Sequence, residues 1–388
     1  MGRHDELRVR LDRAGANWRT WRGRKVVADY GDPNKEYHAV RTDGIGLVDR
    51  SWRDTLVVAG PDAASWLQGL VTSDLRELVR QGAGQLTTMV NAVGRLIADA
   101  RVLALPELLM LDLEPELIET EVRAHLERHI FSEDVTILDR SEQTARLALF
   151  GRGAAALLQS LATGLSRPVG ALEAYEGSWG LIEDMDIVIQ HVVLTGGPGY
   201  EVSCAAEDAP AIWDLLMATG KLTPVGFETI ETLRIEAGVA RFGKELSEQR
   251  IPLEAGLNSA VSFNKGCYLG QEIIARLDTR GKPARLLRTL VFEGGAAPRE
   301  GASVLEWVDE AEVYEAEQAQ PDKDGPHKEG KKIGEVLSSI WSPMLKKPVA
   351  LAYIKRGYNE IDTQVSVDTR PATVQPLGYV LASTALSV

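Results

Sequence analysis

The most chemically varied segment of the sequence is 265–272, which reads Lys-Gly-Cys-Tyr-Leu-Gly-Gln-Glu. Its two glycines permit a tight turn, and the other side chains bring a cation, a thiol, a phenol, an amide and a carboxylate to that turn. A cysteine beside Lys265, at a turn that opens a helix over 271–275, can have a lowered pKa and raised reactivity. The segment therefore predicts a reactive thiol at Cys267, and a small buried cysteine that only packs is the alternative.

The composition narrows the kind of chemistry around this segment. The sequence has 43 Lys and Arg against 56 Asp and Glu, a formal charge of −13 that would repel a polyphosphate, so nucleic acid is not expected as a partner. Only two cysteines are present, Cys204 and Cys267, which excludes a disulfide framework and a zinc site built from thiolates. The six histidines show no metal-ligand spacing with acids, so no metal site is expected.

The first 36 residues are predicted to be an N-terminal helical extension. Arginines alternate there with apolar residues that could pack on the body of the protein: Leu7, Val9, Leu11, Trp18 and Trp21. The segment lacks the apolar core of a signal peptide, and no run approaches the ~20 apolar residues that span a bilayer. With a reducing compartment favoured by the scarcity of cysteine, a soluble cytoplasmic protein without a membrane partner is expected.

The sequence contains an internal repeat, which we call the internal echo, in the elements that would position the candidate residues. Residues 57–70 and 148–161 both read as a strand, a glycine turn and an alanine-rich helix that ends in Leu-Gln-small-Leu. A weaker third copy runs from 200–204 into a helix over 209–217. The echo predicts two related α+β subdomains with a cleft at their interface, and chance similarity of strand–glycine–helix units is the alternative.

After residue 281 the sequence changes to short β-like runs separated by turn residues. They lie at 286–292, 333–338, 349–354, 364–367 and 372–376, and they predict a small β-barrel or a β-sandwich. An insertion at 309–332 is acidic first and lysine-rich last, which is typical of a solvated loop or extended hairpin. Docking of a partner on this acidic loop is a second interpretation.

Segment 265–272 resembles the K-G-C-Y-x-G-Q-E signature of the YgfZ family of folate-binding proteins, relatives of the glycine cleavage T-protein, an aminomethyltransferase. Four other segments resemble motifs of this superfamily in order and spacing, and together they cover residues ~37–380: 37–41, 46–51, 70–75 and 342–345. The resemblance implies an α+β, T-protein-like fold. Two related α+β subdomains would surround a central folate cleft in residues 37–280, and a C-terminal β-barrel would follow in 281–388.

The resemblance also implies a ligand and a function. Tetrahydrofolate, or a reduced derivative of it, would be the cofactor, and the chain would support iron–sulfur cluster assembly or repair with Cys267 as its functional residue. Iron–sulfur proteins or their assembly machinery would be partners of a monomer or weak homo-oligomer. An aminomethyltransferase that passes a one-carbon unit to tetrahydrofolate is the alternative, and a non-catalytic folate-dependent scaffold is a second one.

Individual site residues follow from matching motifs. In T-proteins a glutamate after a Gly-Tyr or Gly-Phe hairpin binds the pterin, and Glu201 after Tyr200 keeps that element; its carboxylate could accept from two N–H donors. Arg234 corresponds to an arginine near the folate tail or the substrate, with a salt bridge to Glu231 or Glu236 as the structural alternative. The remaining candidates for contacts with the ligand are Tyr200, Lys265, Tyr268 and Gln271.

One departure from the family pattern concerns the reaction itself. T-proteins carry two adjacent acids in a G-x-x-x-D-D-x segment, and this sequence has Ala98 followed by Asp99. Asp99 is therefore the candidate catalytic acid or base beside Cys267. An asparagine usual in the neighbouring strand is replaced by Asp112. The loss of the first acid at Ala98 counts against an aminomethyltransferase in the strict sense.

Overall fold

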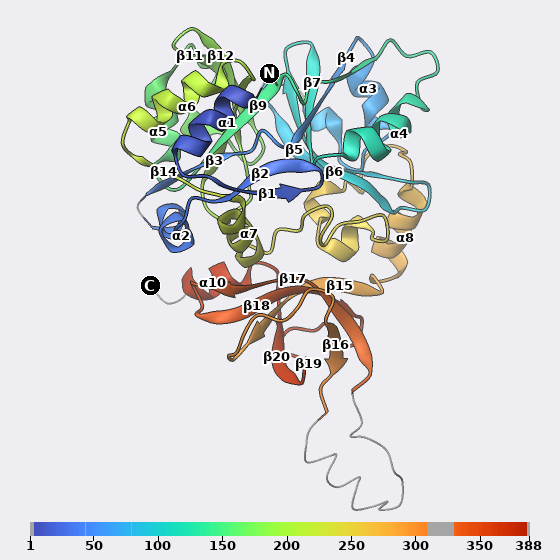
Figure 1. Cartoon of the computed structure of the whole chain (residues 1–388). Coiled ribbons are helices and arrows are strands. Elements are labelled where there is room, and N and C mark those ends of the chain that lie inside the picture. Colours follow the sequence, from blue (N-terminus) through green and yellow to red (C-terminus); the bar gives the residue numbers. More distant parts are fainter. Residues whose placement is uncertain (1–3, 43, 79, 309–329, 386–388) are drawn as a thin grey trace, which may run out of the picture. The chain divides into compact units, whose positions relative to one another are not determined.

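The computed structural model describes residues 4–42, 44–78, 80–308 and 330–385, which form two compact units (Figure 1). The first unit contains Met1–Leu233, Ser247–Pro252 and Leu257–Thr279. The second unit contains Arg234–Leu246, Leu253–Gly256 and Arg280–Val388, so two short central segments belong with the C-terminal strands. None of the helices described is long and apolar enough to cross a membrane.

The N-terminal segment is only partly helical. Helix α1 (Asp5–Arg13) buries Leu7 and Leu11, as predicted, whereas Val9, also expected to pack, is exposed. The chain then forms a hairpin of β1 (Asn17–Trp21) and β2 (Arg24–Asp29) before α2 (Pro33–Arg41). The hairpin forms because Arg22 and Gly23 both take positive φ angles, 42° and 69°, as a two-residue turn of this kind requires. Trp21 thus lies in a strand, where the sequence pattern indicated a helix.

A five-stranded antiparallel sheet follows in the first unit, with the strand order β5-β6-β7-β4-β8. Its strands are β4 (Asp54–Ala59), β5 (Gly84–Val90), β6 (Leu96–Leu105), β7 (Leu108–Leu113) and β8 (Thr136–Asp139). The helical segments between them are α3 (Ala63–Gln68), η1 (Leu75–Glu77), η2 (Ile118–Val122) and α4 (Arg123–Glu127).

The second sheet of this unit has seven strands in the order β10-β11-β12-β13-β9-β3-β14. They are β3 (Ile45–Asp49), β9 (Thr144–Phe150), β10 (Ala162–Thr163), β11 (Gly177–Ile182), β12 (Met185–His191), β13 (Gly199–Ala205) and β14 (Leu222–Pro224). Its helices are α5 (Ala154–Leu161), η3 (Val169–Ala171), α6 (Ala209–Ala218) and α7 (Phe227–Glu236). Only β14 pairs in parallel, with β3.

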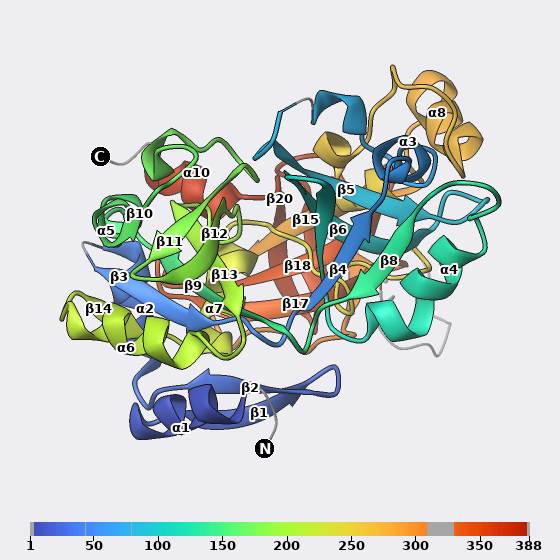
Figure 2. The same ribbon diagram turned by 90° about the horizontal axis from the view of Figure 1, so that it is seen from above.

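The internal echo of the sequence is a repeat of topology. In each sheet a three-stranded meander ends beside the strand that preceded it, β5-β6-β7 beside β4 and β11-β12-β13 beside β9 (Figure 2). Both first strands run through a glycine with positive φ, Gly60 at 114° and Gly151 at 132°, into a helix. A Cβ atom would overlap the carbonyl oxygen of Asp134 at Gly60 and that of Gly44 at Gly151. The prediction of two related α+β subdomains is confirmed.

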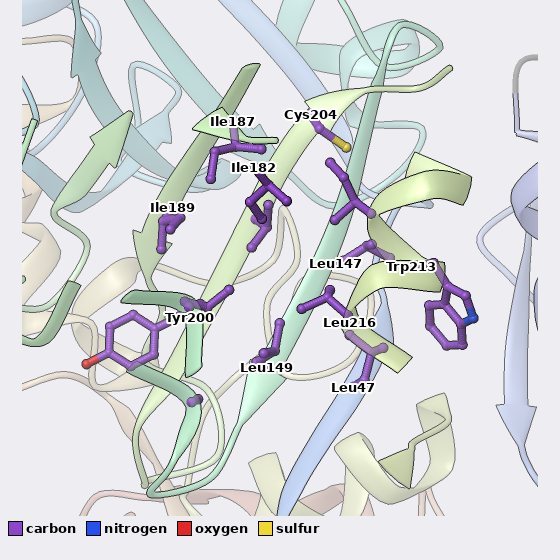
Figure 3. Packing of buried hydrophobic residues seen from close by; sticks show 14 of the residues in the cluster. Leu47, Leu147, Leu149, Ile182, Ile187, Ile189, Tyr200, Cys204, Trp213 and Leu216 are labelled. Carbon is purple, nitrogen blue, oxygen red and sulfur yellow. The ribbon is translucent and has the colours of Figure 1, made fainter. Parts of the chain in front are cut away.

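The seven-stranded sheet covers an apolar core of the first unit. Strand β13 shows how its two faces differ: Tyr200, Val202 and Cys204 belong to this core, which also contains residues of α5 and α6 (Figure 3). Successive side chains of a strand point to opposite faces, so Glu201 and Ser203 face away from these helices. That second face is the one on which the buried charges lie.

The C-terminal strands form a closed barrel in the order β15-β18-β17-β16-β19-β20, with β20 paired to β15. They are β15 (Arg285–Phe292), β16 (Ser303–Glu306), β17 (Lys332–Ser342), β18 (Lys347–Lys355), β19 (Gln364–Val367) and β20 (Arg370–Gln375), followed by α10 (Tyr379–Ala385). The barrel is confirmed over the sandwich, and β16 is the strand that the sequence pattern missed. Most of the acidic insertion lies outside the described residues, so its predicted docking role stays a prediction.

Three further segments precede the barrel strands: η4 (Pro252–Ala255), η5 (Asn258–Ala260) and helix α8 (Gln271–Arg280). The segment 265–272 runs into the first turn of α8. Its approach is fixed by Gly270, whose φ of 78° and missing Cβ let the chain pass against the Asn91 carbonyl in the turn between β5 and β6. The predicted helix after Tyr268 is therefore present and extends further than the sequence indicated.

Candidate functional site

Buried charged side chains link the two sheets of the first unit. We call them the inter-sheet cluster, and its members are Arg50, Arg53, Arg101, Arg146, Asp112, Glu114 and Glu201, each less than one tenth exposed. Four guanidinium groups face three carboxylates, so the cluster carries one net positive charge unless another acid joins it. Asp99 on β6 is that neighbouring acid.

Two arginines bridge the sheets directly. Arg101 of β6 donates to Asp112 of the adjacent strand β7 at 2.6 Å and to Glu201 of β13, in the other sheet, at 2.7 Å. Arg146 of β9 donates to Asp112, to Glu201 at 3.2 Å and to the Thr55 hydroxyl at 2.6 Å. Charge-assisted hydrogen bonds of this kind are about twice as strong as neutral ones, so they fix the spacing of the two sheets.

The contact between Thr55 and Arg146 reflects the repeat. Each of them lies five residues before its repeat's glycine, Gly60 and Gly151, and thus occupies the same strand position. Equivalent residues of two related halves meet only near the axis that relates the halves. The inter-sheet cluster is therefore centred on the interface of the two subdomains, where the sequence analysis expected the cleft.

The N-terminal hairpin reaches the same cluster. The indole Nε1 of Trp21 donates to Glu114 at 3.1 Å, and Arg53 pairs with both Glu114 and Asp112, in the latter case through Nε at 2.7 Å. Trp21 also packs with Trp52 and Phe227 in a small aromatic core. The first residues of the chain are thus part of the site's support.

Glu201, the predicted pterin ligand, lies at the centre of the cluster and is 1% exposed. Burial alone would raise the pKa of its carboxyl group, but the attraction of Arg101, Arg50 and Arg146 outweighs burial and holds that pKa below its ordinary value. Glu201 is therefore an anion in the folded protein. Its Oε1 accepts the hydrogen bonds from Arg101 and Arg146, while Oε2 lies 3.1 Å from Arg50 without a hydrogen bond from any described residue.

Asp99, the predicted catalytic acid, is half-buried on β6 and pairs in register with Thr88 of β5. Burial, followed by repulsion from Glu114, raises the pKa of its carboxyl group to about 6, against an opposing attraction from Arg53. Within the described part of the chain, its Oδ1 has no hydrogen-bond partner. Asp99 can therefore both hold and release a proton close to neutral pH. Ala98, at the place of the family's first acid, is fully buried.

Lys265 occupies a different place in the first unit. Its ammonium donates to the carbonyl oxygens of Gln68 at 2.6 Å, Val71 at 2.8 Å and Ser73 at 2.7 Å, which uses all three of its hydrogens. Burial lowers its pKa to about 8. Lys265 thereby fastens the 265–272 segment to the chain that follows α3, and a role in binding a ligand stays a prediction.

The other candidates of this segment differ strongly in exposure. Cys267 is a free, exposed thiol. The side chain of Tyr268 is buried, and the centre of its ring lies 5.1 Å from the Lys265 ammonium. Burial raises the pKa of the Tyr268 hydroxyl to about 12. Gln271 is the first residue of α8 and is half-buried. The alternative of a buried, inert cysteine fits Cys204 in the apolar core, and Cys267 is the thiol that reagents and partners can reach.

Arg234 and Tyr200 both make contacts within the folded chain: Arg234 in a buried ion pair and Tyr200 in the apolar core. In the second unit, the buried Arg234 donates to Glu245 at 2.9 Å, to the Ser338 hydroxyl at 3.1 Å and to a backbone carbonyl. A structural salt bridge of Arg234 is thus present, and Glu245 is a partner in it. Tyr200 stacks on His191 at 5.0 Å between ring centres and lies in the apolar core, away from the charges. Binding roles for both stay predictions.

The sequence analysis missed the arginines of the cluster. Arg146 stands inside the apolar run of β9, and Arg101 shares one strand face with Asp99, two residues away. A cation within a buried strand requires a buried anion, and that signal was available in the sequence. Among the residues that the structure describes, no group of three or more His, Cys, Asp or Glu side chains could hold a metal ion.

The fold and site define a class of protein: two related α+β subdomains joined by buried charges, followed by a closed β-barrel. Residues 7–265 match the GCVT N-terminal domain family, and residues 285–378 match the glycine cleavage T-protein C-terminal barrel domain family. The chain therefore belongs to the glycine cleavage T-protein family.

Relatives of similar length support this assignment. The chain is 31% identical over 353 residues to an aminomethyltransferase of Halalkalibacterium halodurans, covering 90% of this chain and 88% of the relative. It is 31% identical over 363 residues to an aminomethyltransferase of Geobacillus kaustophilus, covering 92% of each. The crystal structure of glycine cleavage system aminomethyltransferase T from Bartonella henselae shares the fold, with a TM-score of 0.82 and 23% identity over 96% of this chain and 97% of that one.

Proposed function

We propose that the chain binds tetrahydrofolate at the inter-sheet cluster and transfers a one-carbon unit to it, as an aminomethyltransferase. The observation that carries the proposal is Asp99, a half-buried acid with a pKa of about 6 and a free oxygen. It stands at the subdomain interface of a chain that aligns almost end to end with aminomethyltransferases. This alternative of the sequence analysis has more support than its main interpretation.

The residues present suit a reduced pterin. A pterin ring offers N–H donors beside a carbonyl acceptor. Among the described residues, Glu201 Oε2 is ion-paired with Arg50 but accepts no hydrogen bond, and Arg50 Nε donates none. Burial lowers the pKa of Arg50 to about 9, so its guanidinium remains charged at neutral pH. The Glu201 carboxylate, kept ionised by three arginines, would accept from the pterin edge.

Asp99 would manage the proton of the reaction. Tetrahydrofolate, when bound, would supply the amine that takes the aminomethyl carbon as its bond to the lipoyl sulfur breaks. The lipoyl thiol and then ammonia would leave, and each nitrogen of the folate that bonds to this carbon would give up one proton. A carboxyl group with a pKa of about 6 is mostly ionised at pH 7 and can take that proton, and it can return it near the same pH. Glu114 and Arg53 act on the pKa of Asp99 in opposite directions: Glu114 raises it and Arg53 lowers it.

Reconstitution with a lipoyl carrier protein and glycine decarboxylase tests the proposed reaction. The wild-type chain should form methylene-tetrahydrofolate, and Asp99→Asn should slow turnover by about 10²-fold or more, since a positioned acid or base contributes 10²–10⁴-fold. Glu272→Gln, a substitution on the exposed face of α8, is the matched control and should leave the rate unchanged. Absence of product with the wild-type protein would rule out the aminomethyltransferase.

A second candidate function is favoured by the segment 265–272. Cys267 is exposed two residues after the buried Lys265, and Ala98 stands where the T-protein pattern has its first acid. Both features support the YgfZ-type interpretation, in which a folate-binding protein serves iron–sulfur cluster assembly or repair and contacts iron–sulfur proteins. Here Cys267 is the reacting group and tetrahydrofolate the bound cofactor.

Complementation separates the two functions. In a strain that lacks the protein, Cys267→Ala should fail to restore iron–sulfur enzyme activity if the thiol is needed, and Cys204→Ala is the control for loss of a thiol in the core. Full rescue by Cys267→Ala would remove the thiol from the mechanism. The third interpretation is a non-catalytic folate-dependent scaffold. Such a protein would bind tetrahydrofolate and form no product, and its Asp99→Asn variant would still restore the deletion strain.

A further inference from the structure

Tyr175 adopts an uncommon backbone conformation beside the proposed ligand site. It lies in the turn between η3 and β11 with a φ of 69°, in the left-handed region that residues with a Cβ rarely enter. Asparagine, aspartate and glycine are the usual residues at such angles, and a tyrosine gains nothing from them locally. A strained position of this kind persists only when its surroundings fix it.

The surroundings of Tyr175 do fix it. Its backbone N–H donates to the His191 carbonyl at 3.0 Å, and its carbonyl accepts from the Gln190 side chain at 2.9 Å. The next residue, Glu176, pairs with Arg80 and accepts from Arg167 at 2.7 Å. These contacts come from strand β12, from Arg167 just before the turn and from Arg80 before β5, so the backbone of the turn at Tyr175 is held in place.

Gly84 completes this fit from the opposite sheet. It is the first residue of β5, and a Cβ atom there would overlap the Tyr175 carbonyl oxygen. The turn of the seven-stranded sheet is thus seated directly on the five-stranded sheet, near the start of the β5–β6 pair. Gly84 has no positive φ, so close approach of the Tyr175 backbone is the reason that a side chain does not fit there.

Tyr175 lies over the face of the β5–β6 pair that carries the site charges. Gly84, whose missing Cβ faces the Tyr175 carbonyl, shares that face with Arg101 and Asp99, because Gly84 pairs with Leu103, two residues beyond Arg101 on β6. Burial raises the pKa of its hydroxyl, and Arg101 and Asp99 are the two charged groups that act on it, the first lowering and the second raising that pKa. The side chain is half-buried, and its hydroxyl has no hydrogen bond to a described residue. The Tyr175 hydroxyl is therefore a donor within electrostatic range of both Asp99 and Arg101.

We propose that Tyr175 is a further ligand-binding residue of the inter-sheet site, whose hydroxyl donates a hydrogen bond to the ligand beside Asp99. The ring would form a wall against the planar part of that ligand, since aromatic faces stack on flat conjugated groups. The strained turn and Gly84 have the task of holding the phenol there. This inference rests on the proposed function, because it takes tetrahydrofolate as the ligand.

Titration calorimetry with tetrahydrofolate on the full chain tests the proposal. Tyr175→Phe keeps the ring and the turn and removes only the hydroxyl, so we expect the Kd to rise about 3- to 10-fold, the loss of one hydrogen bond, with an unchanged Tm. Tyr358→Phe, in the second unit, is the matched control and should bind as the wild type does. Gly84→Ala keeps the phenol and displaces its backbone, and should also weaken binding, whereas Gly170→Ala, where a Cβ has free space, should not.

The outcomes separate this proposal from the function on which it rests. Tight binding by wild type with an equal Kd for Tyr175→Phe would overturn the role of Tyr175 and leave the folate site standing. No binding by wild type would overturn both. A higher Kd for Tyr175→Phe together with a lower Tm would indicate that the hydroxyl has a structural role, and it would also count against the proposal.

Discussion

Arg101 and Glu201 lie in different sheets, and the guanidinium of the first donates to the carboxylate of the second at 2.7 Å. The pair makes the Glu201 anion possible, because a carboxylate that is 1% exposed would otherwise be protonated. It also couples assembly of the two subdomains to the state of the site. Ligand binding and stability should therefore respond together to changes in the inter-sheet cluster.

Removal of the Arg101 guanidinium should be costly. Arg101→Met leaves Glu201 and Asp112 with fewer partners in a buried place, and breaking such a pair costs about 3–5 kcal/mol. Urea unfolding followed by circular dichroism measures it. Arg76→Met is the control, since Arg76 pairs with Asp74 at the surface, where an ion pair contributes about 0–1 kcal/mol. Equal losses for the two variants would contradict the importance of the cluster.

Asp99 should make the protein less stable as the pH rises. Its pKa is about 6 in the folded chain and about 3.9 in an unfolded one, so the folded state binds the proton more tightly between those values. Stability from this group is complete below pH 4 and is lost as the pH rises through 6. Asp99→Asn should thus be more stable than wild type above pH 6, by at most about 2–3 kcal/mol, and the difference should vanish near pH 4.

Measured free energies of unfolding at pH 4 and pH 7 check this sign. A gain for Asp99→Asn that appears only at pH 7 supports a half-buried acid whose ionisation is costly. A loss of stability at pH 7 would mean that the Asp99 carboxylate is paired, contrary to its free Oδ1. If Asp99→Asn is more stable at pH 7 and also loses turnover, the Asp99 carboxyl group lowers stability in exchange for function.

The two repeat glycines should be equally intolerant of a side chain. Gly60→Ala and Gly151→Ala each impose a positive φ on alanine and push a methyl group into a backbone carbonyl, so each should destabilise the protein by more than about 2 kcal/mol. Gly164→Ala is the control, because its φ is 61° but nothing lies near the added methyl, and about 1 kcal/mol is expected. Thermal unfolding of the three variants decides the comparison.

Thiol labelling should distinguish the two cysteines. Cys267 is exposed, whereas Cys204 is packed in the apolar core, where burial raises the pKa of its thiol to about 12. A maleimide should label one thiol quickly in the native protein and the second only on unfolding, and Cys267→Ala should abolish the fast reaction. Fast labelling that survives Cys267→Ala would show that the core around Cys204 opens.

Much of the fold could be predicted because its signals are local. The strand–glycine–helix echo depends on neighbouring residues, and the alternating runs after residue 281 indicate strands without knowledge of their partners. The choice between a barrel and a sandwich could not be made this way, since closure depends on β15 pairing with β20, more than 70 residues away. The hairpin at 17–29 differs from the predicted helix because it depends on the two-residue turn at Arg22 and Gly23, and the spacing of apolar residues carries no sign of that turn.

Individual residues of the site could be predicted from the sequence, but the hydrogen bonds and ion pairs that join them could not. Asp99 and Glu201 were named as site residues and belong to the same interface. Arg101 and Arg146 were not, because their partners come from other strands and, in part, from the other sheet. Lys265 shows the converse: its place beside a cysteine indicated chemistry, whereas the fold uses its ammonium to hold three carbonyls 192 to 197 residues away in sequence.

Direct titration of the chain with tetrahydrofolate is the measurement closest to the central claim, that Oε2 of Glu201, which accepts no hydrogen bond from a described residue, recognises a reduced pterin. We predict saturable binding by the wild type, at least tenfold weaker binding by Glu201→Gln, and wild-type binding by Glu272→Gln, whose carboxylate lies on the exposed face of α8. Equal affinity of Glu201→Gln and wild type, or no saturable binding by wild type, would contradict the account.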